Sequence, residues 1–276
     1  GALTVHYARQ FDPLVVSMYR GLSLIVTMLP LLFFASWQEI FAVKDQILTL
    51  FLSAGIGSVA FATSLSGSRY LPVGVASSLR QTLIVPVAIL IGIVFLDEYL
   101  TLLQILLLAG IAACAIALTM LRTHHSHLDP AKALRGVLLS ACAGVGSAVA
   151  WYFFSIAARE LHPFVAAYFV EVGVGLCTLL YFIILRLSRL NTSNAHIPLR
   201  SVRNIVLIGM LTIFGTGGYA IAINHGPYPL ASGLMMGTIL VSTLVAWFIF
   251  RERLNRLQIG LILTAVILMF LIRIVS

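Results

Sequence analysis

The chain has 276 residues, of which 61% are hydrophobic and only 9% are charged, whereas an ordinary soluble domain is about a quarter charged and under half apolar. A water-soluble fold of this composition would expose enough apolar surface to aggregate. The composition therefore excludes a soluble enzyme, a secreted scaffold and a nucleic-acid-binding protein, and predicts an all-α polytopic membrane protein. The formal net charge of +8 fits this class, because the excess Lys and Arg of membrane proteins gather in short cytoplasmic loops.

Long apolar runs follow one another along the chain, and each approaches the roughly 20 residues that a helix needs to span a bilayer. The runs cover 13–35, 47–68, 73–96, 101–121, 136–159, 163–186, 203–224, 228–250 and 255–275. Residues 1–10 are too short to span, and the chain begins at Gly1 without a methionine. We therefore expect ten helices, of which the first is present only as its tail.

An internal repeat divides these helices into two groups of five. The segment from Glu98 to Ile105 aligns with the segment from Glu252 to Ile259, so that the Glu, two Leu, the Gln and the Ile coincide. Because five is an odd number of crossings, the second group must enter the membrane from the opposite side. An inverted repeat is typical of transporters, with the binding site near the bilayer midplane between the halves. We predict repeats at 1–121 and 136–276, joined by a linker loop at 122–135.

These features resemble the drug/metabolite transporter superfamily, in its ten-helix EamA-type branch. The resemblance rests on the acidic turn with Glu98 or Glu252 in each half, on the Leu-x-x-Leu-Gln-Ile segment that follows Glu98, and on the run from Tyr70 to Ser78. The run is similar to the entry into the family's fourth helix. The match covers essentially the whole chain, although its motifs are architectural. The resemblance implies two inverted five-helix repeats and transport of amino acids and related metabolites, often outward.

Three charged residues lie well inside predicted helices, where a charge costs several kcal/mol and is a functional hypothesis by default. Arg20 and Arg80 are about seven residues into their helices, roughly 10–12 Å below one membrane face. Glu171 is about eight residues in from the opposite face, so all three fall near one level of a core about 30 Å thick. The functional interpretation is a polar site between the halves, where one Arg pairs with Glu171 and the other receives an anion. The structural alternative is that the Arg side chains snorkel or cap backbone carbonyls.

Aromatic and polar residues on the same helices extend this candidate site. Such rings could stack on a solute or cage an amine, although each alone is more often a packing residue. The candidate substrate-binding set is Arg20, Arg80, Glu171, Tyr19, Tyr168, Gln81, Tyr7, Trp151, Tyr219 and Asn224. Pro86, in the middle of the 73–96 run, frees the carbonyl of Thr82, so it is a candidate gate hinge, with passive packing as the alternative.

The sequence lacks the patterns of several other chemistries. It has no GxxxxGK[ST] phosphate-binding loop, which leaves ATP-driven transport by this chain alone unsupported, and no Ser-His-Asp or HExxH arrangement. The cluster His124, His125 and His127 lies in a predicted loop without a nearby cysteine. We therefore expect no enzymatic activity, no metal site and no cofactor.

The two membrane faces differ in basic residues, with twelve Lys and Arg on one predicted face and three on the other. The positive-inside rule places the basic face in the cytoplasm, whereas the resemblance implies the reverse, so the orientation stays open. The predicted function is secondary transport of a small anionic or zwitterionic solute by alternating access. A lipid-headgroup translocase and a non-transporting membrane scaffold remain as alternatives.

The predicted surroundings follow from this function. We expect a multi-pass protein of the bacterial inner membrane. Its expected partners are the solute, the lipid bilayer and a coupling proton, with no nucleic acid. Import or export, and a monomer or a homodimer, are left open by the sequence.

Overall fold

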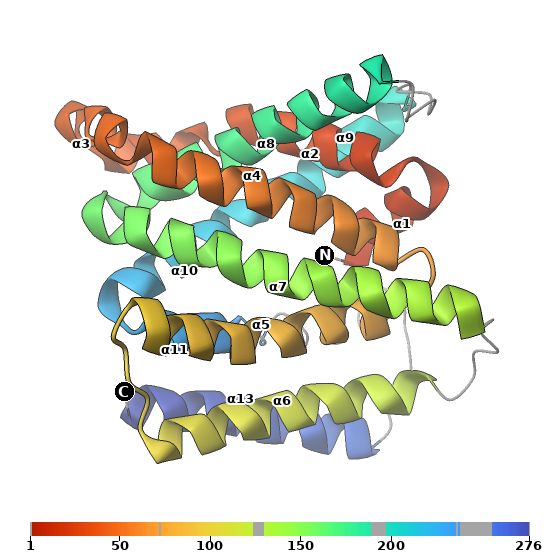
Figure 1. Cartoon of the computed structure of the whole chain (residues 1–276), viewed down its shortest axis with the longest axis vertical. Helices are drawn as coiled ribbons and strands as arrows, with labels where there is room; N and C mark the ends of the chain where they lie inside the picture. The colour runs from red at the N-terminus through yellow and green to blue at the C-terminus, as the bar shows by residue number, and fades with distance from the viewer. Residues whose placement is uncertain are drawn as a thin grey trace.

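The computed structural model describes residues 2–71, 73–123, 130–188, 197–235, 237 and 256–275. Throughout these ranges the regular structure is helical, which confirms the predicted class. Among the described residues, six helical stretches are long and apolar enough to cross a membrane, judged by length and composition. Figure 1 shows the helices stacked side by side and running along one common direction, as expected of a membrane-spanning bundle.

The predicted first half begins with a short helix over Ala2–Gln10. Asp12 caps the second helix, since its Oδ1 accepts hydrogen bonds from the backbone N–H groups of Leu14 (2.8 Å) and Val15 (3.3 Å), and Pro13 occupies a position where its missing N–H costs nothing. A short helix, α3, lies before the predicted span at 47–68. The elements are α1 (Ala2–Gln10), α2 (Pro13–Thr27), η1 (Leu29–Phe34), α3 (Trp37–Phe41), α4 (Val43–Gly67), α5 (Val73–Phe95) and α6 (Leu102–Thr123).

The second half follows the predicted spans with one difference, because the run 203–224 forms two helices that meet at Leu211. The run 228–250 begins as a helix, and most of its remainder lies outside the described residues. The elements are α7 (Pro130–Glu160), α8 (Pro163–Leu187), α9 (Leu199–Met210), α10 (Thr212–His225), α11 (Tyr228–Leu234) and α13 (Arg256–Val275). Helices α6 and α7 both extend into the predicted linker. The inverted relation fits this order of helices but stays a prediction, since Glu252 lies outside the described residues.

A pair of glycines brings α2 of the first half against α8 of the second. A Cβ atom on Gly21 would lie 2.6 Å from the Cα of Gly175, and a Cβ on Gly175 would lie 2.6 Å from the carbonyl oxygen of Gly21. Small residues at such crossings let membrane helices approach closely. Because Gly21 is next to Arg20, and Gly175 is one turn after Glu171, this contact determines how near these two charged residues come.

Helices α6 and α13 lie side by side at one edge of the bundle (Figure 1). Leu108 and Ile111 of α6 are buried in one cluster with Ile272 of α13. The segments 103–118 and 257–272 contain no charged residue, from which the sequence predicts that both helices stand outside the transport path. Their position at the edge agrees with that prediction.

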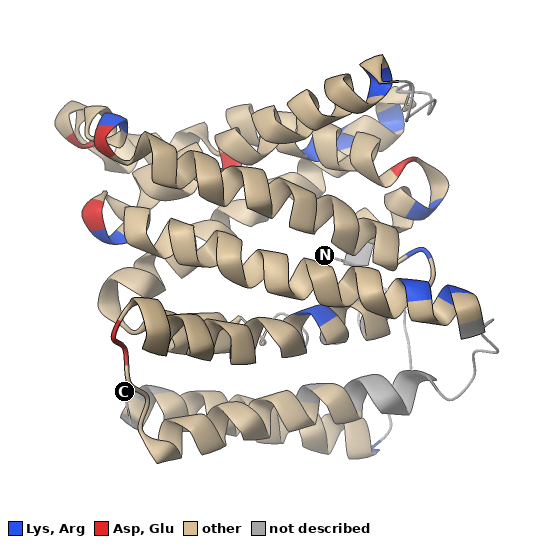
Figure 2. Cartoon of the chain, viewed as in Figure 1, with Lys and Arg blue, Asp and Glu red and all other residues tan. Residues whose placement is uncertain are grey.

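Charged residues are concentrated near the two ends of the helices. Figure 2 shows Lys, Arg, Asp and Glu mainly at these ends, with few along the middle of the bundle. This distribution is expected where the middle lies in hydrocarbon, because an intramembrane charge is expensive. The exceptions therefore require a specific explanation.

The glycine contact leads to a first prediction. Gly175→Ala should destabilise the protein by about 1–3 kcal/mol, because the new methyl group meets backbone atoms that cannot move aside without separating the helices. The matched control is Gly218→Ala in α10, where a Cβ would meet nothing within 4 Å and where alanine improves helix propensity. Unfolding in mixed detergent micelles measures both. Equal effects of the two substitutions would contradict the proposed role of the contact.

Candidate functional site

Arg20 on α2 is held inside the bundle by two neighbours from other helices. Its Nη2 donates a hydrogen bond to the Oγ1 of Thr212 on α10, at 3.0 Å. Its guanidinium carbon lies 4.4 Å from the centroid of the Phe61 ring on α4, a geometry in which the aromatic face attracts a cation. The side chain is half-buried, and these two contacts are with a hydroxyl and a ring. The carbonyl-capping alternative therefore does not describe Arg20, because its contacts are with two side chains.

Glu171 on α8 is buried, with 7% of its surface exposed. Its Oε1 accepts a hydrogen bond of 2.6 Å from the Oγ1 of Thr216, which is also buried on α10. Thr212 and Thr216 are four residues apart, so they lie on one face of α10 with their Cβ atoms about 5–6 Å apart. Arg20 and Glu171 thus reach neighbouring positions on the same helix face.

The expected ion pair between Glu171 and an arginine is not formed among the described residues. Arg20 and Glu171 each contact a separate threonine hydroxyl instead. Thr212 and Thr216 are not among the site residues predicted from the sequence. Their signal was the four-residue spacing of two hydroxyls within an apolar run, which places both on one side of a helix.

Arg80 on α5 adds a second positive charge to this region. Its Nε is buried and has no hydrogen-bond partner within the described part of the chain, and Arg20 lies close enough for the two charges to repel one another. Helix α7 packs directly on this turn of α5, since a Cβ on Gly144 would lie 2.7 Å from the carbonyl oxygen of Arg80. The interior region formed by Arg20, Glu171, Thr212 and Thr216 is here called the charged site, and Arg80 is included in it because of its electrostatic interaction with Arg20. It contains two basic groups and one carboxyl group.

The tyrosines of the candidate set use their hydroxyls in contacts between helices. The Tyr168 hydroxyl donates to the carbonyl oxygen of Ile25 on α2, at 3.2 Å. The Tyr7 hydroxyl accepts a bond of 2.8 Å from Nδ2 of Asn204 on α9. Tyr168 therefore joins α8 to α2 beside the glycine contact, and Tyr7 joins α1 to the second half.

The other candidates fall into two groups. Tyr19 is half-buried and next to Arg20, and Gln81 is 3% exposed and next to Arg80, so both border the charged site in sequence. Trp151 packs edge-to-face on Tyr219, with ring centroids 4.5 Å apart, and Asn224 is half-buried near the end of α10. This second group is part of, or close to, an aromatic cluster between α7, α10 and α11.

Pro86 does not interrupt α5, which runs as one helix from Val73 to Phe95. The proline side chain is exposed on the surface of the bundle. Its role as a gate hinge stays a prediction.

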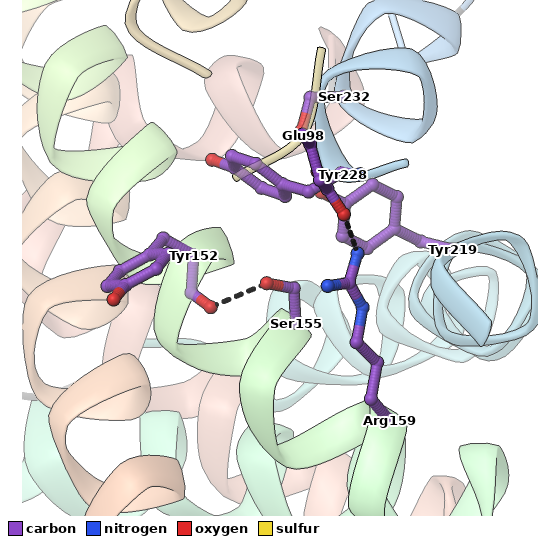
Figure 3. A network of polar contacts seen from close by, with 7 residues as sticks. All are labelled: Glu98, Tyr152, Ser155, Arg159, Tyr219, Tyr228 and Ser232. Atoms are coloured by element: carbon purple, nitrogen blue, oxygen red, sulfur yellow. Dashed lines mark hydrogen bonds and ion pairs between the residues drawn. The ribbon is translucent and has the colours of Figure 1, made fainter. Parts of the chain in front are cut away.

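A second polar network lies at one end of the bundle, around Glu98, for which the sequence predicts only an architectural role. The carboxylate of Glu98 forms an ion pair with the guanidinium of Arg159 at the end of α7 (Figure 3). The other oxygen of Glu98 accepts a hydrogen bond of 2.9 Å from the backbone N–H of Tyr228 on α11. The sequence does contain a signal for this ion pair, because the predicted topology puts Glu98 and Arg159 on the same membrane face.

Two cavities of about 290 and 300 Å³ share no lining residue with either polar region. Both are lined by Val59, Thr63 and Tyr181, in a groove between α4 and α8 that also reaches α7 at Gly146. Their lining is mainly apolar. Since Val59 is half exposed on the outside of the bundle, this groove faces the side where lipid would lie.

Comparison with known proteins identifies the family. The model of the EamA-like transporter family matches residues 134–274, just over half of the chain. A solved structure titled only "Crystal structure of protein" is 15% identical, with a TM-score of 0.68, and the match covers 98% of this chain and 88% of that chain. This likeness shows a shared fold, and no curated protein matches the sequence. The chain belongs to the EamA-like transporter family and is a multi-pass integral membrane protein.

Proposed function

We propose that this chain is a secondary transporter of a small anionic or zwitterionic solute, such as an amino acid, and that it works by alternating access. The observation that carries the proposal is the pair Arg20 and Arg80 in the charged site. Neither guanidinium forms a salt bridge with an acidic residue in the described ranges. Buried cations are expensive unless something neutralises them, and a solute carboxylate or phosphate would supply the missing charge.

The chemistry of the site suits such a solute. A guanidinium donates several N–H groups in a planar fork that matches a carboxylate or phosphate, and the buried Nε of Arg80 retains an unused donor. Glu171 would attract the amine of a zwitterion, with Tyr19 and Phe61 beside the charged groups. In a transporter built from inverted repeats, a site of this kind is exposed to each side of the membrane in turn.

Glu171 is also the residue that we propose for the coupling proton. Its hydrogen-bond partner is the neutral hydroxyl of Thr216 at 2.6 Å, and an ionised carboxylate buried without a cation is costly. Protonation removes that cost, and so does an arriving amine. Competition between a proton and the solute for one carboxyl group is a direct way to couple their movements.

The setting of this transporter is the bacterial inner membrane in our proposal, on the basis of the resemblance to bacterial ten-helix transporters. Export and import remain equally compatible with the charged site, because a site at the midplane is loaded from either face.

Removing one arginine should weaken binding of an anionic solute. We expect Arg80→Gln to raise the Kd of an anionic ligand about tenfold or more, because a hydrogen bond to a charged group is worth about 1.5–3 kcal/mol. An uncharged analogue, such as the amide of the same acid, should be unaffected. Ligands are first found by a thermal-shift screen of amino acids and organic acids, where a ligand at 100 times its Kd stabilises by about 2.7 kcal/mol.

The matched control for this variant is Arg256→Gln, which removes an exposed guanidinium from the start of α13. If Arg80→Gln and Arg256→Gln bind the ligand equally well, the anion-binding role of Arg80 is wrong.

A separate prediction concerns proton coupling. Glu171→Gln keeps an oxygen that can accept the hydrogen bond from Thr216, so the fold should be retained, but the side chain can no longer bind and release a proton. In proteoliposomes we expect exchange of labelled solute to persist, and accumulation driven by a pH gradient to disappear.

Thr216→Val provides the comparison, since it removes the hydroxyl and leaves the carboxyl able to titrate. Accumulation that survives Glu171→Gln would exclude Glu171 as the coupling group.

A lipid-headgroup translocase is the second candidate function, and the apolar groove at Val59, Thr63 and Tyr181 favours it. This function predicts movement of fluorescent phospholipid between leaflets of proteoliposomes, measured by dithionite quenching. The solute transporter predicts flux of the screened ligand without lipid movement. Absence of both activities would indicate a membrane scaffold.

A further inference from the structure

The network around Glu98 joins parts of the chain that are far apart in sequence. Glu98 lies in the connection between α5 and α6, whereas Arg159 ends α7 and Tyr228 begins α11. Figure 3 shows the ion pair between the two charged groups, with the Tyr219, Tyr228 and Ser232 side chains beside it. One carboxylate thus connects the predicted first half to two helices of the predicted second half.

The turn that presents Glu98 is well defined by backbone contacts. The N–H of Glu98 donates to the carbonyl oxygen of Gly92 at 2.9 Å, and the N–H of Leu96 donates to the same oxygen at 3.2 Å. Asp97 has a φ of 51°, a left-handed conformation that Asp adopts more readily than most residues. These contacts hold Glu98 toward the bundle at the end of α5, while the neighbouring Asp97 is exposed.

Closely packed side chains lie behind the ion pair. A Cβ on Gly92 would lie 2.5 Å from Cγ of Pro229, so α5 and α11 are in direct contact there. Tyr228 is completely buried, and its hydroxyl donates to the carbonyl oxygen of Ala148 on α7, at 2.6 Å. The hydroxyls of Tyr219 and Ser232 lie 2.9 Å apart. This end of the interface between the halves is therefore closed in the structure.

The ion pair itself is near the surface and can exchange with water. The Glu98 side chain is 15% exposed and that of Arg159 is 32% exposed. Pairs that are this accessible contribute little to stability, because water competes for both charges. A contact that is specific in geometry and weak in strength suits a position that must open and close repeatedly.

We propose that Glu98, Arg159 and Tyr228 form a gate, which closes one end of the transport path and opens once in each cycle. This inference rests on the proposed alternating access, in which the halves must separate first at one end of the site and then at the other. Separation at this end has to break the ion pair and the Glu98–Tyr228 hydrogen bond, since both cross from the first half to the second. The gate is separate from the charged site and from the groove at Val59.

The test measures opening directly and needs no transported solute. Ser155 lies on α7 one turn before Arg159 and is completely buried, so a cysteine there becomes reactive only when the gate opens. The reporter is Ser155→Cys in a Cys142→Ser background, because Cys142 is exposed while Cys114 and Cys177 are buried. The purified protein in nanodiscs is treated with a water-soluble maleimide, which reaches both faces.

We expect Glu98→Gln and Arg159→Gln each to increase the labelling rate of the reporter several-fold. Asp97→Asn is the matched control, since it removes the adjacent carboxylate and retains a residue that tolerates the left-handed conformation, and it should leave the rate unchanged. Arg159→Lys keeps a cation opposite Glu98 and leaves the hydrogen bond from Tyr228 to Glu98 in place, so it should label more slowly than Arg159→Gln, which separates loss of the ion pair from local unfolding.

Equal labelling of the parent, Glu98→Gln and Arg159→Gln would overturn the gate, and so would equal acceleration by Asp97→Asn. A chain that moves no solute but shows the predicted labelling would instead remove the proposed function and leave the opening motion in place. The two failures are therefore distinguishable.

Discussion

The need of every interior charge for a polar partner organises this bundle. At the membrane face that carries most of the basic residues, Arg9 and Arg69 donate hydrogen bonds to backbone carbonyl oxygens. Arg9 donates to Ser68 and Leu71. Arg69 donates to Ala8 and Phe11. In the interior, Arg20 and Glu171 use two threonine hydroxyls on α10. A single hydroxyl leaves most N–H donors of a guanidinium unused, which is why the interior arginines are suited to a solute and those at the end are suited to holding the chain together.

Much of the fold could be predicted from the sequence, because the long apolar runs indicate where most of the spans lie. The break at Leu211 could not, since neither glycine nor proline interrupts the run at that position. The depth of a residue in the membrane could be predicted by counting residues from the end of its helix, and this count puts Arg20 and Glu171 at nearly the same depth. The direction in which each side chain points depends on packing between helices, and for that reason the threonine partners and the pairing of Glu98 with Arg159 required the structure.

In the transport cycle that we propose, the two polar regions have different tasks. The proposed task of the charged site is to recognise a solute through groups that hydrocarbon strongly disfavours, whereas the network at Glu98 lies where water already reaches both partners. Separating the buried groups of the charged site without a ligand costs much free energy. Breaking the exposed ion pair between Glu98 and Arg159 costs little. This difference favours movement at the end of the bundle while the interior keeps its arrangement.

The contact of Gly21 with Gly175 constrains how this chain can vary. Neither position can acquire a side chain unless α2 and α8 move apart, and such a shift would also carry Arg20 from Thr212 and Glu171 from Thr216. A variant at either glycine could therefore fold, reach the membrane and still lose selectivity, although it alters no group that touches a solute. A substitution at one glycine could be compensated only by a second substitution on the facing helix. Substitutions that persist at this contact in evolution should therefore occur in pairs, one on α2 and one on α8.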